Sequence, residues 1–234
     1  MNNTRKKTLA IVLRRTDFGE ADRIVNLLTP GGKVSAMARG VRKPKSKLAG
    51  GIEFFALNEV VLIEGKSEMR TLSSARMREF FGEILKDFER TEFAYQAIKT
   101  VSWLCEQIES DNFFEILLTV FRSLNNFEID LSLIKKWFNL KMAEFSGDEI
   151  NLERDKNGKP LQADLTYSFD FYDKVFVEDS EGDFNANHIK FLRLMLSSQP
   201  QIISKVKGNE KILEDLKEVF LMLNKKQKNA CVYF

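Results

Sequence analysis

A change in the spacing of apolar residues near position 76 limits, more than any other feature, how this chain can fold. Before it, short runs rich in β-branched and apolar residues are separated by turn residues such as Pro30-Gly31-Gly32 and Gly65. Runs of this kind are typical of β-strands. After it, apolar residues recur every three or four positions, which is typical of helices. The sequence therefore predicts an α+β protein with its main strands first.

The N-terminal part is predicted to contain five short strands, joined by turns and by one long loop. Their expected ranges are residues 8–15, 22–29, 33–39, 54–64 and 69–75. Five short strands in so small a segment are typical of a closed barrel such as an OB-fold. We therefore predict a domain of the OB-fold type over residues 1–76.

Residues 77–234 are predicted to form an all-helical domain with one irregular insertion. The expected helices cover residues 77–88, 92–109, 113–124, 131–145, 185–198 and 209–223. Asp130 can cap the fourth helix, and Asn185 or Asn187 can cap the fifth. Residues 148–185 lack a helical period and include an alternating stretch, so a small hairpin-like insertion is expected there.

Positive charge is concentrated at the start of the chain. Residues 1–50 contain twelve Lys and Arg against three Asp and Glu, a net +9, whereas the remaining residues sum to −7. The segment Lys33–Gly51, KVSAMARGVRKPKSKLAGG, contains no acid. Its second part, the basic loop (Gly40–Gly51), carries four cations. These are Arg42, Lys43, Lys45 and Lys47.

The cations of the basic loop must face water or an anionic partner, because burying unpaired charge is costly. A cationic loop leaving a small sheet is typical of nucleic-acid binding, although a merely solvated surface loop has the same composition. Phe18, Phe54 and Phe55 are candidates for stacking on bases, a contact that OB-folds use on single strands. The strand period does not decide which of these rings points outward.

The sequence predicts no catalytic residue, no metal site and no cofactor. Two cysteines, Cys105 and Cys231, and one histidine, His188, are too few for a four-ligand zinc site. We expect Cys105 to be a buried thiol and His188 to be solvated. Gly31-Gly32-Lys33 lacks the spacing and the following helix of a phosphate-binding loop, so it indicates a hairpin turn.

Residues 11–55, IVLRRTDFGEADRIVNLLTPGGKVSAMARGVRKPKSKLAGGIEFF, resemble the N-terminal signature of the RecO family of DNA repair proteins. The matching features are an acidic-Arg turn (GEADR), Leu-Thr followed by Gly-Lys, Ala-x-Gly, and a loop of the form Arg/Lys-Pro-Lys-Ser-x-Leu-x-Gly. The remainder is similar in length and order to the rest of that family. The resemblance implies an OB-fold barrel followed by a helical domain.

The resemblance also implies a non-enzymatic recombination mediator in DNA repair. Such a protein would bind single- and double-stranded DNA and anneal complementary strands. Its implied partners are RecR, the C-terminal tail of single-strand-binding protein and, indirectly, RecA. The implied DNA-binding residues are Lys33, Arg39, Arg42, Lys43, Lys45 and Lys47, with Arg14 and Arg23 as further candidates. For the tail, the helix Leu131–Phe145 with Lys135, Lys136 and Lys141 is one candidate site.

The chain departs from the family pattern in one segment. Many members carry a four-cysteine zinc module where this chain has Pro160–Asp183, and this segment contains no cysteine. We expect it to be held by apolar packing in place of a metal. The residues expected to pack are Phe169, Phe171, Tyr172, Val175 and Phe176.

Two other functions fit the same residues. An OB-fold RNA-binding module would use the same basic loop, because phosphate contacts carry little identity. A protein-interaction adaptor would act through the acidic helical part.

The sequence contains no apolar run that approaches the eighteen residues needed to span a membrane. The five consecutive apolar residues that follow the basic start are too few for a signal peptide. We expect a cytoplasmic, nucleoid-associated protein without membrane contact.

Overall fold

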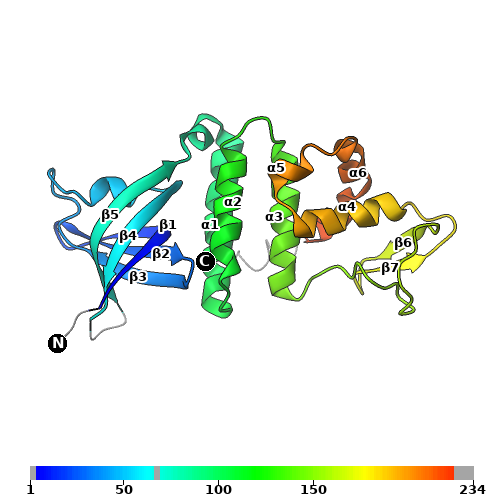
Figure 1. Cartoon of the computed structure of the whole chain (residues 1–234), viewed down its shortest axis with the longest axis horizontal. Helices are drawn as coiled ribbons and strands as arrows, with labels where there is room; N and C mark the ends of the chain where they lie inside the picture. Colours follow the sequence, from blue (N-terminus) through cyan, green and yellow to red (C-terminus); the bar gives the residue numbers. More distant parts are fainter. Residues whose placement is uncertain (1–3, 66–68, 224–234) are drawn as a thin grey trace. The chain divides into compact units, whose positions relative to one another are not determined.

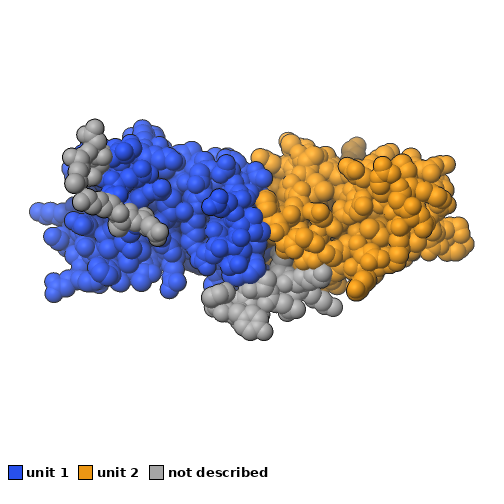
Figure 2. Space-filling view, turned by 90° about the horizontal axis from the view of Figure 1, so that it is seen from below, with its two compact units in different colours: residues 1–126 blue, residues 127–234 orange. Residues whose placement is uncertain are grey.

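The computed structural model of the chain describes residues 4–65 and 69–223, without the side chain of Ala49, so Cys231 lies outside it. Five N-terminal strands are followed mainly by helices, which confirms the α+β class (Figure 1). The chain divides into two compact units, residues 1–126 and 127–234 (Figure 2). Unit 1 contains the five strands and two helices. The two units are defined by their compactness. The expected boundary between barrel and helices, at residue 76, is a different division and stays a prediction.

The five strands of unit 1 close into a barrel in the order β1-β2-β3-β5-β4. Neighbouring strands are antiparallel except β3 and β5, which are parallel. The first half of β1 pairs with β4 and the second half with β2, so this strand belongs to both sides of the barrel. The strands are β1 (Arg5–Phe18), β2 (Asp22–Thr29), β3 (Gly32–Ala38), β4 (Ala56–Ile63) and β5 (Arg70–Phe80).

Alternate residues of the strands face the barrel interior, as the period of two predicts. Val25 lies opposite Ala36, for example, and both are fully buried. Two residues of the basic-loop region, Val41 and Ile52, enter the same core. The buried cluster consists of Ala10, Val12, Val25, Leu27, Ala36, Ala38, Val41, Ile52, Val60, Leu62, Leu72 and Ala75.

The helix predicted to begin at Met77 is wrong, because β5 continues to Phe80. Met77 pairs with Asn58 of β4, and a short 3-10 helix, Gly82–Lys86, separates the strand from the first α-helix. Apolar residues three and four apart in a run this short fit the end of a strand as well as a helix. The long-range pairing with β4 decides between the two.

Two helices complete unit 1, α1 (Phe88–Gln107) and α2 (Asn112–Leu124), and they lie side by side (Figure 1). Helix α2 is buried on nearly every side, as its apolar sequence indicates. An aromatic cluster joins it to the barrel. The ring centroid of Phe121 lies 5.6 Å from that of Phe55 and 5.7 Å from that of Phe81. The two helices are thereby packed onto the barrel as part of one hydrophobic unit.

The helices of unit 2 are α3 (Leu131–Ser146), α4 (Ala186–Ser197), α5 (Pro200–Ile203) and α6 (Asn209–Asp215). Both predicted caps are confirmed. The carboxylate of Asp130 accepts from the N–H of Leu133, and the side chain of Asn185 accepts from the N–H of Asn187. Helical backbone resumes after α6 and continues to Leu223. Among the residues that the structure describes, no helix combines the length and the apolar character needed to cross a membrane.

The predicted hairpin insertion is confirmed, and its two antiparallel strands are β6 (Tyr167–Asp170) and β7 (Val175–Glu178). Phe169 and Phe176 are buried in it, with ring centroids 5.2 Å apart. The expected packing of Tyr172 is wrong. Its side chain is 90% exposed and Phe171 is half exposed, because both lie in the turn between the strands.

His188, which was expected to be solvated, is buried. Its Nδ1 accepts a hydrogen bond from the N–H of Asn185 at 3.1 Å, and its Nε2 lies 3.2 Å from the carboxylate of Asp215. The first contact closes a capping box at the start of α4 and turns the imidazole against the helix. The second partner lies on α6, too far along the chain to be recognised from the local sequence.

Candidate nucleic-acid interface

The basic loop leaves the barrel after β3 and is bound at its base to the turn between β1 and β2. Gly40 has a positive φ of 63°, a conformation that glycine adopts without strain. Its N–H donates to the carboxylate of Asp22 at 2.7 Å. The N–H of Arg42 donates to the carbonyl of Ala21 at 2.9 Å, and its guanidinium donates to the carbonyl of Gly19 at 3.2 Å. Three hydrogen bonds therefore hold the start of the loop in place.

The rest of the basic loop is attached through apolar side chains that enter the barrel core. Val41 is 2% exposed and Ile52 is fully buried, while Leu48 packs against the same cluster. Between these anchors the chain turns, and the N–H of Ser46 donates to the carbonyl of Lys43 at 2.9 Å. Because the apolar residues occupy the core side, the cations between them are held on the outside.

Four predicted DNA-binding residues form an exposed set on this loop and its approach. They are Arg39, Lys43, Lys45 and Lys47. Within residues 4–65 and 69–223, none of the four has an ion pair or a side-chain hydrogen bond. An anion that approaches this set displaces only solvent and counterions, because no internal ion pair has to be broken. The structure thus brings together the central part of the predicted site.

Arg23 and Arg42, two further predicted residues, share the carboxylate of Asp17. The Nε of Arg23 donates to Oδ1 at 2.7 Å, and the Nε of Arg42 lies 3.6 Å from Oδ2. The hydrogen bond from Arg23, with the charge of Arg42, holds the pKa of Asp17 below its usual value, so the carboxylate remains ionised. The two guanidinium groups are thereby held beside the loop with part of their charge compensated.

Lys33 and Arg14 lie apart from the exposed set. The ammonium of Lys33 donates to the hydroxyl of Ser102 at 3.1 Å and lies 2.6 Å from Glu106, both on α1. This lysine therefore attaches α1 to β3, and only 16% of its side chain is exposed. Arg14 is exposed and pairs with Asn26 of β2, on the side of the strand that points away from the barrel core.

Only one of the three candidate stacking residues is open to solvent. Phe18 is 53% exposed at the end of β1, next to the turn that binds the basic loop. Phe55 is 1% exposed and packs against Phe121, so its candidacy for base stacking is wrong. Phe54 is half-buried beneath the guanidinium of Arg15, which lies 4.5 Å from the ring centroid.

Arg15 belongs to this region although the sequence reasoning did not select it. Its guanidinium donates to the carbonyl of Ile52 at 3.3 Å and to the carboxylate of Glu53 at 2.8 Å. It therefore links β1 to the residues that follow the basic loop. The sequence does contain a signal that Arg15 differs from Arg14. Side chains alternate along a strand, so the two arginines lie on opposite sides of β1.

In unit 2, the lysines of α3 differ in how far they are already engaged. Lys141 donates to the carbonyl of Leu196 and lies 3.0 Å from Glu144. Lys136 donates a hydrogen bond to a neutral group, the hydroxyl of Ser132 at 2.8 Å. Its ammonium lies 6.0 Å from the ring centroid of Phe220, and desolvation lowers its pKa. An ammonium group next to an aromatic ring combines a cation with an apolar wall. Lys136 is therefore better placed than Lys141 to receive a carboxylate from an acidic, apolar partner.

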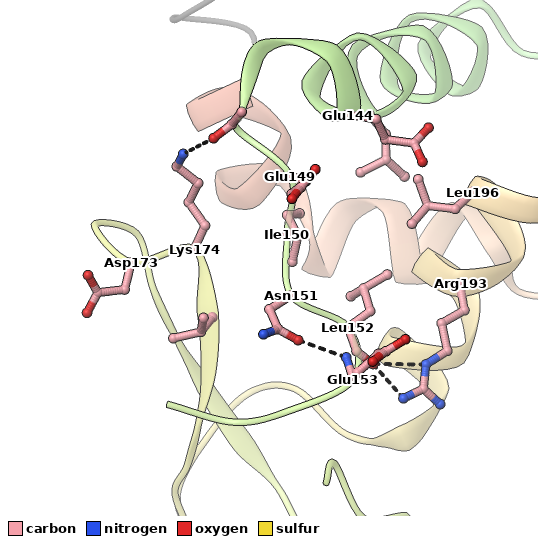
Figure 3. A pocket seen from close by; sticks show the side chains of 13 residues that line it. Glu144, Glu149, Ile150, Asn151, Leu152, Glu153, Asp173, Lys174, Arg193 and Leu196 are labelled. Carbon is pink, nitrogen blue, oxygen red and sulfur yellow. Dashed lines mark hydrogen bonds between the residues drawn. The ribbon is translucent and has the colours of Figure 1, made fainter. Parts of the chain in front are cut away.

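A pocket of about 710 Å³ also lies in unit 2, between α3, the segment after it, the β6–β7 turn and α4 (Figure 3). Its two cations, Lys174 and Arg193, donate to backbone carbonyls of that segment, as the dashed lines in Figure 3 show for Arg193. Glu149 and Glu153 are exposed beside them. With its cations engaged and carboxylates at its edge, this pocket does not suit an anionic ligand.

Comparison with known proteins identifies the family. The family model described as "Recombination protein O N terminal" matches residues 1–81. A protein named DNA repair protein RecO from Dehalococcoides mccartyi (strain ATCC BAA-2266 / KCTC 15142 / 195) is 30% identical over 218 residues, which are 90% of this chain and 85% of that protein. A protein of the same name from Roseiflexus sp. (strain RS-1) is 40% identical over 129 residues, which are 54% of this chain and 45% of that protein. Another, from Heliobacterium modesticaldum (strain ATCC 51547 / Ice1), is 38% identical over 156 residues, which are 65% of this chain and 56% of that protein. Because the similarity extends through both units, the chain belongs to the RecO family of DNA repair proteins.

Proposed function

We propose that this protein is a non-enzymatic recombination mediator that binds DNA through its N-terminal barrel. It binds single- and double-stranded DNA and anneals complementary strands. Together with RecR, it helps to load RecA onto DNA that is coated with single-strand-binding protein. Membership of the RecO family supports the role in DNA repair. The anchored basic loop supports contact with nucleic acid.

The observation that carries the proposal is the unpaired, exposed cationic set Arg39, Lys43, Lys45 and Lys47. Contacts between cations and phosphates supply most of the non-specific affinity for DNA and do not read its sequence. Phe18 adds an exposed ring beside the loop, on which an unpaired base can stack. Binding should therefore depend strongly on salt and weakly on sequence.

The remaining predicted residues have supporting roles in this proposal. Arg23 and Arg42 hold the base of the loop and add positive charge near the phosphate path. Arg14 extends that path along the outside of β1, and Lys33 positions β3 against α1. The closed five-stranded barrel with a long loop after its third strand is typical of an OB-fold. We assign DNA binding to the domain 1–76 and protein partners to 77–234.

For the acidic tail of single-strand-binding protein, we propose α3, with Lys136 as the cation that receives the terminal carboxylate. Helix-in-groove and carboxylate-capture contacts of this kind combine an apolar wall with one well-placed cation. Fluorescence polarisation of a labelled tail peptide tests the assignment. Lys136→Ala should weaken binding at least fivefold, whereas Lys211→Ala, an exposed lysine on α6, should not. Equal affinities of the two variants would refute the site.

No metal or catalytic group is assigned in this proposal. Phe169 and Phe176 pack in the β6–β7 hairpin, so its core is apolar where many family members are expected to hold zinc. Metal analysis of the purified protein tests this directly, since one zinc per chain would overturn it.

Strand annealing on DNA coated with single-strand-binding protein is the experiment that tests the function. The protein should accelerate annealing of coated complementary strands, and replacing Lys43, Lys45 and Lys47 by Gln should remove most of that acceleration. Competition with RNA of equal length distinguishes the alternative function. If RNA displaces the labelled DNA more effectively than unlabelled DNA does, the barrel is an RNA-binding module.

A further inference from the structure

We propose that the barrel binds a second nucleic-acid strand on the outer face of β1, β4 and β5, through cations other than those of the basic loop. This inference rests on the proposed DNA-binding function and extends it from one strand to two. In Figure 1 the three strands lie together, and their pairing places β4 in the middle. The surface, called the outer β4 face, consists of Arg5, Lys7, Glu59, Arg76 and Arg78.

The strand register places these residues on one side of the sheet. Glu59 pairs with Arg76 of β5, and Val61 pairs with Lys7 of β1. Val60, between them, points into the barrel core, so its neighbours point outward. Adjacent strands are about 4.8 Å apart and successive outward residues about 7 Å apart, so the cations cover a patch of roughly 10 by 15 Å.

The outer β4 face has a clear excess of positive charge. Its carboxylate, Glu59, accepts a hydrogen bond from Arg78 and lies 3.0 Å from the ammonium of Lys7, and these contacts lower its pKa. Arg5 and Arg76 are exposed, and no ion pair to either occurs in the described part of the chain. Four cations around one ionised carboxylate leave a net charge of +3 on a small surface.

The β1 side of this face lies apart from the basic loop, whereas its β5 side runs beside the end of the loop, where Gly51 packs against Ala75. The loop is bound at Gly19 and Ala21, just beyond the end of β1, whereas Arg5 and Lys7 are at the beginning of that strand. The strand between Lys7 and Phe18 covers about eleven residues, up to roughly 35 Å when extended. A single strand held at the start of the basic loop therefore leaves Arg5 and Lys7 free for another.

A phosphate backbone matches this face better than an acidic protein segment does. Protein interfaces have an apolar, usually aromatic, core. Here the centre offers aliphatic residues, the half-buried Val61 and Ile63 and the partly exposed Leu9, in place of an aromatic core. Arginine binds phosphate oxygens in a bidentate manner, and two of the cations at the β5 edge are arginines. Two polyanionic strands repel each other, so cations on two faces of one barrel would lower the cost of bringing complementary strands together.

A bridging assay tests this inference. Oligo(dT) of about ten nucleotides, within the range that one OB-fold covers, is immobilised and loaded with protein. After washing, labelled oligo(dT) is added, which cannot pair with the first strand, and its capture is measured. The variant Arg5→Gln/Arg76→Gln should bind the immobilised strand within twofold of the native protein but capture at least tenfold less of the second. Arg5→Lys/Arg76→Lys should restore capture, and Lys205→Gln/Lys207→Gln, which removes two exposed charges from unit 2, should leave it unchanged.

Each contrary result has a distinct meaning. Normal capture by the Gln variant overturns the second strand site, and if that variant has also lost binding of a polyglutamate peptide, the face serves an acidic protein. Loss of first-strand binding by the Gln variant also overturns the inference, because both surfaces then form one site. If the native protein binds the first strand but captures no second, the inference fails and the proposed function stands. If the native protein binds no single strand at all, the proposed function itself fails.

Discussion

Replacing Lys43, Lys45 and Lys47 by glutamine should weaken binding to single-stranded DNA by an amount that the structure allows one to estimate. The three ammonium groups are exposed and have no ionic partner among the described residues. Their removal breaks no internal contact, so the loss of affinity reflects phosphate contacts alone. Arg42 is left unchanged, because its hydrogen bonds to Ala21 and Gly19 hold the base of the loop.

The magnitude follows from counterion release. Each phosphate neutralised on a single strand contributes about 0.7 to the slope of log affinity against log salt, so three contacts contribute about 2. Between a 1 M reference and about 0.15 M salt, one contact is worth about 0.6 of a log unit, or about 0.8 kcal/mol. The triple variant should therefore bind about 50-fold more weakly at physiological salt, a loss of about 2.3 kcal/mol.

Fluorescence polarisation with labelled oligo(dT), repeated over a range of salt concentrations, measures both the affinity and the slope. The matched control replaces three exposed lysines of unit 2, Lys205, Lys207 and Lys211, and so changes the net charge equally. It should alter affinity less than twofold, because screening limits charges beyond about 10 Å at this salt. Equal slopes for the two triple variants would mean that net charge, and not the loop, governs binding. An unchanged slope in the loop variant would refute the site.

Three further predictions concern single side chains. Phe18→Ala should weaken binding to single-stranded DNA by about 1–3 kcal/mol, with little effect on binding to duplex DNA. Phe55→Ala should instead lower the free energy of unfolding, measured in denaturant, by about 3–5 kcal/mol. The reverse pattern would contradict the assignment of the two rings. Lys156 holds the pKa of Asp170 at about 2, below its usual 3.8. The carboxylate therefore stabilises the fold above pH 4 and loses this effect as the pH falls towards 2, so Asp170→Asn should flatten the dependence of Tm on pH in that range; parallel profiles would exclude the linkage. Burial raises the pKa of Cys105 to about 11. In a variant without the other cysteine, this thiol should therefore react with iodoacetamide at pH 8 far more slowly in the folded protein than in the unfolded protein. Equal rates in the two states would disprove the effect of burial.

Local patterns identified most elements correctly. The strand Asp22–Thr29 has the predicted bounds, and helix α2 is buried on nearly all sides, as its apolar composition indicates. The caps Asp130 and Asn185 accept hydrogen bonds from backbone N–H groups in the first turns of their helices. These features depend on residues within one turn or one strand, so a linear pattern contains the information that specifies them.

The sequence alone thus determined the α+β class, the order of the elements and the segment in which positive charge is concentrated, because each depends on composition and local spacing. The tertiary structure decided which of the charges are available. Lys33 is engaged by Ser102 and Glu106, residues about 70 positions away, whereas Lys43 remains open. It likewise decided that Phe55 is buried and Phe18 exposed, and that β5 runs on to Phe80. In each case the deciding partner is distant in sequence and adjacent in space, and no local period records such a contact.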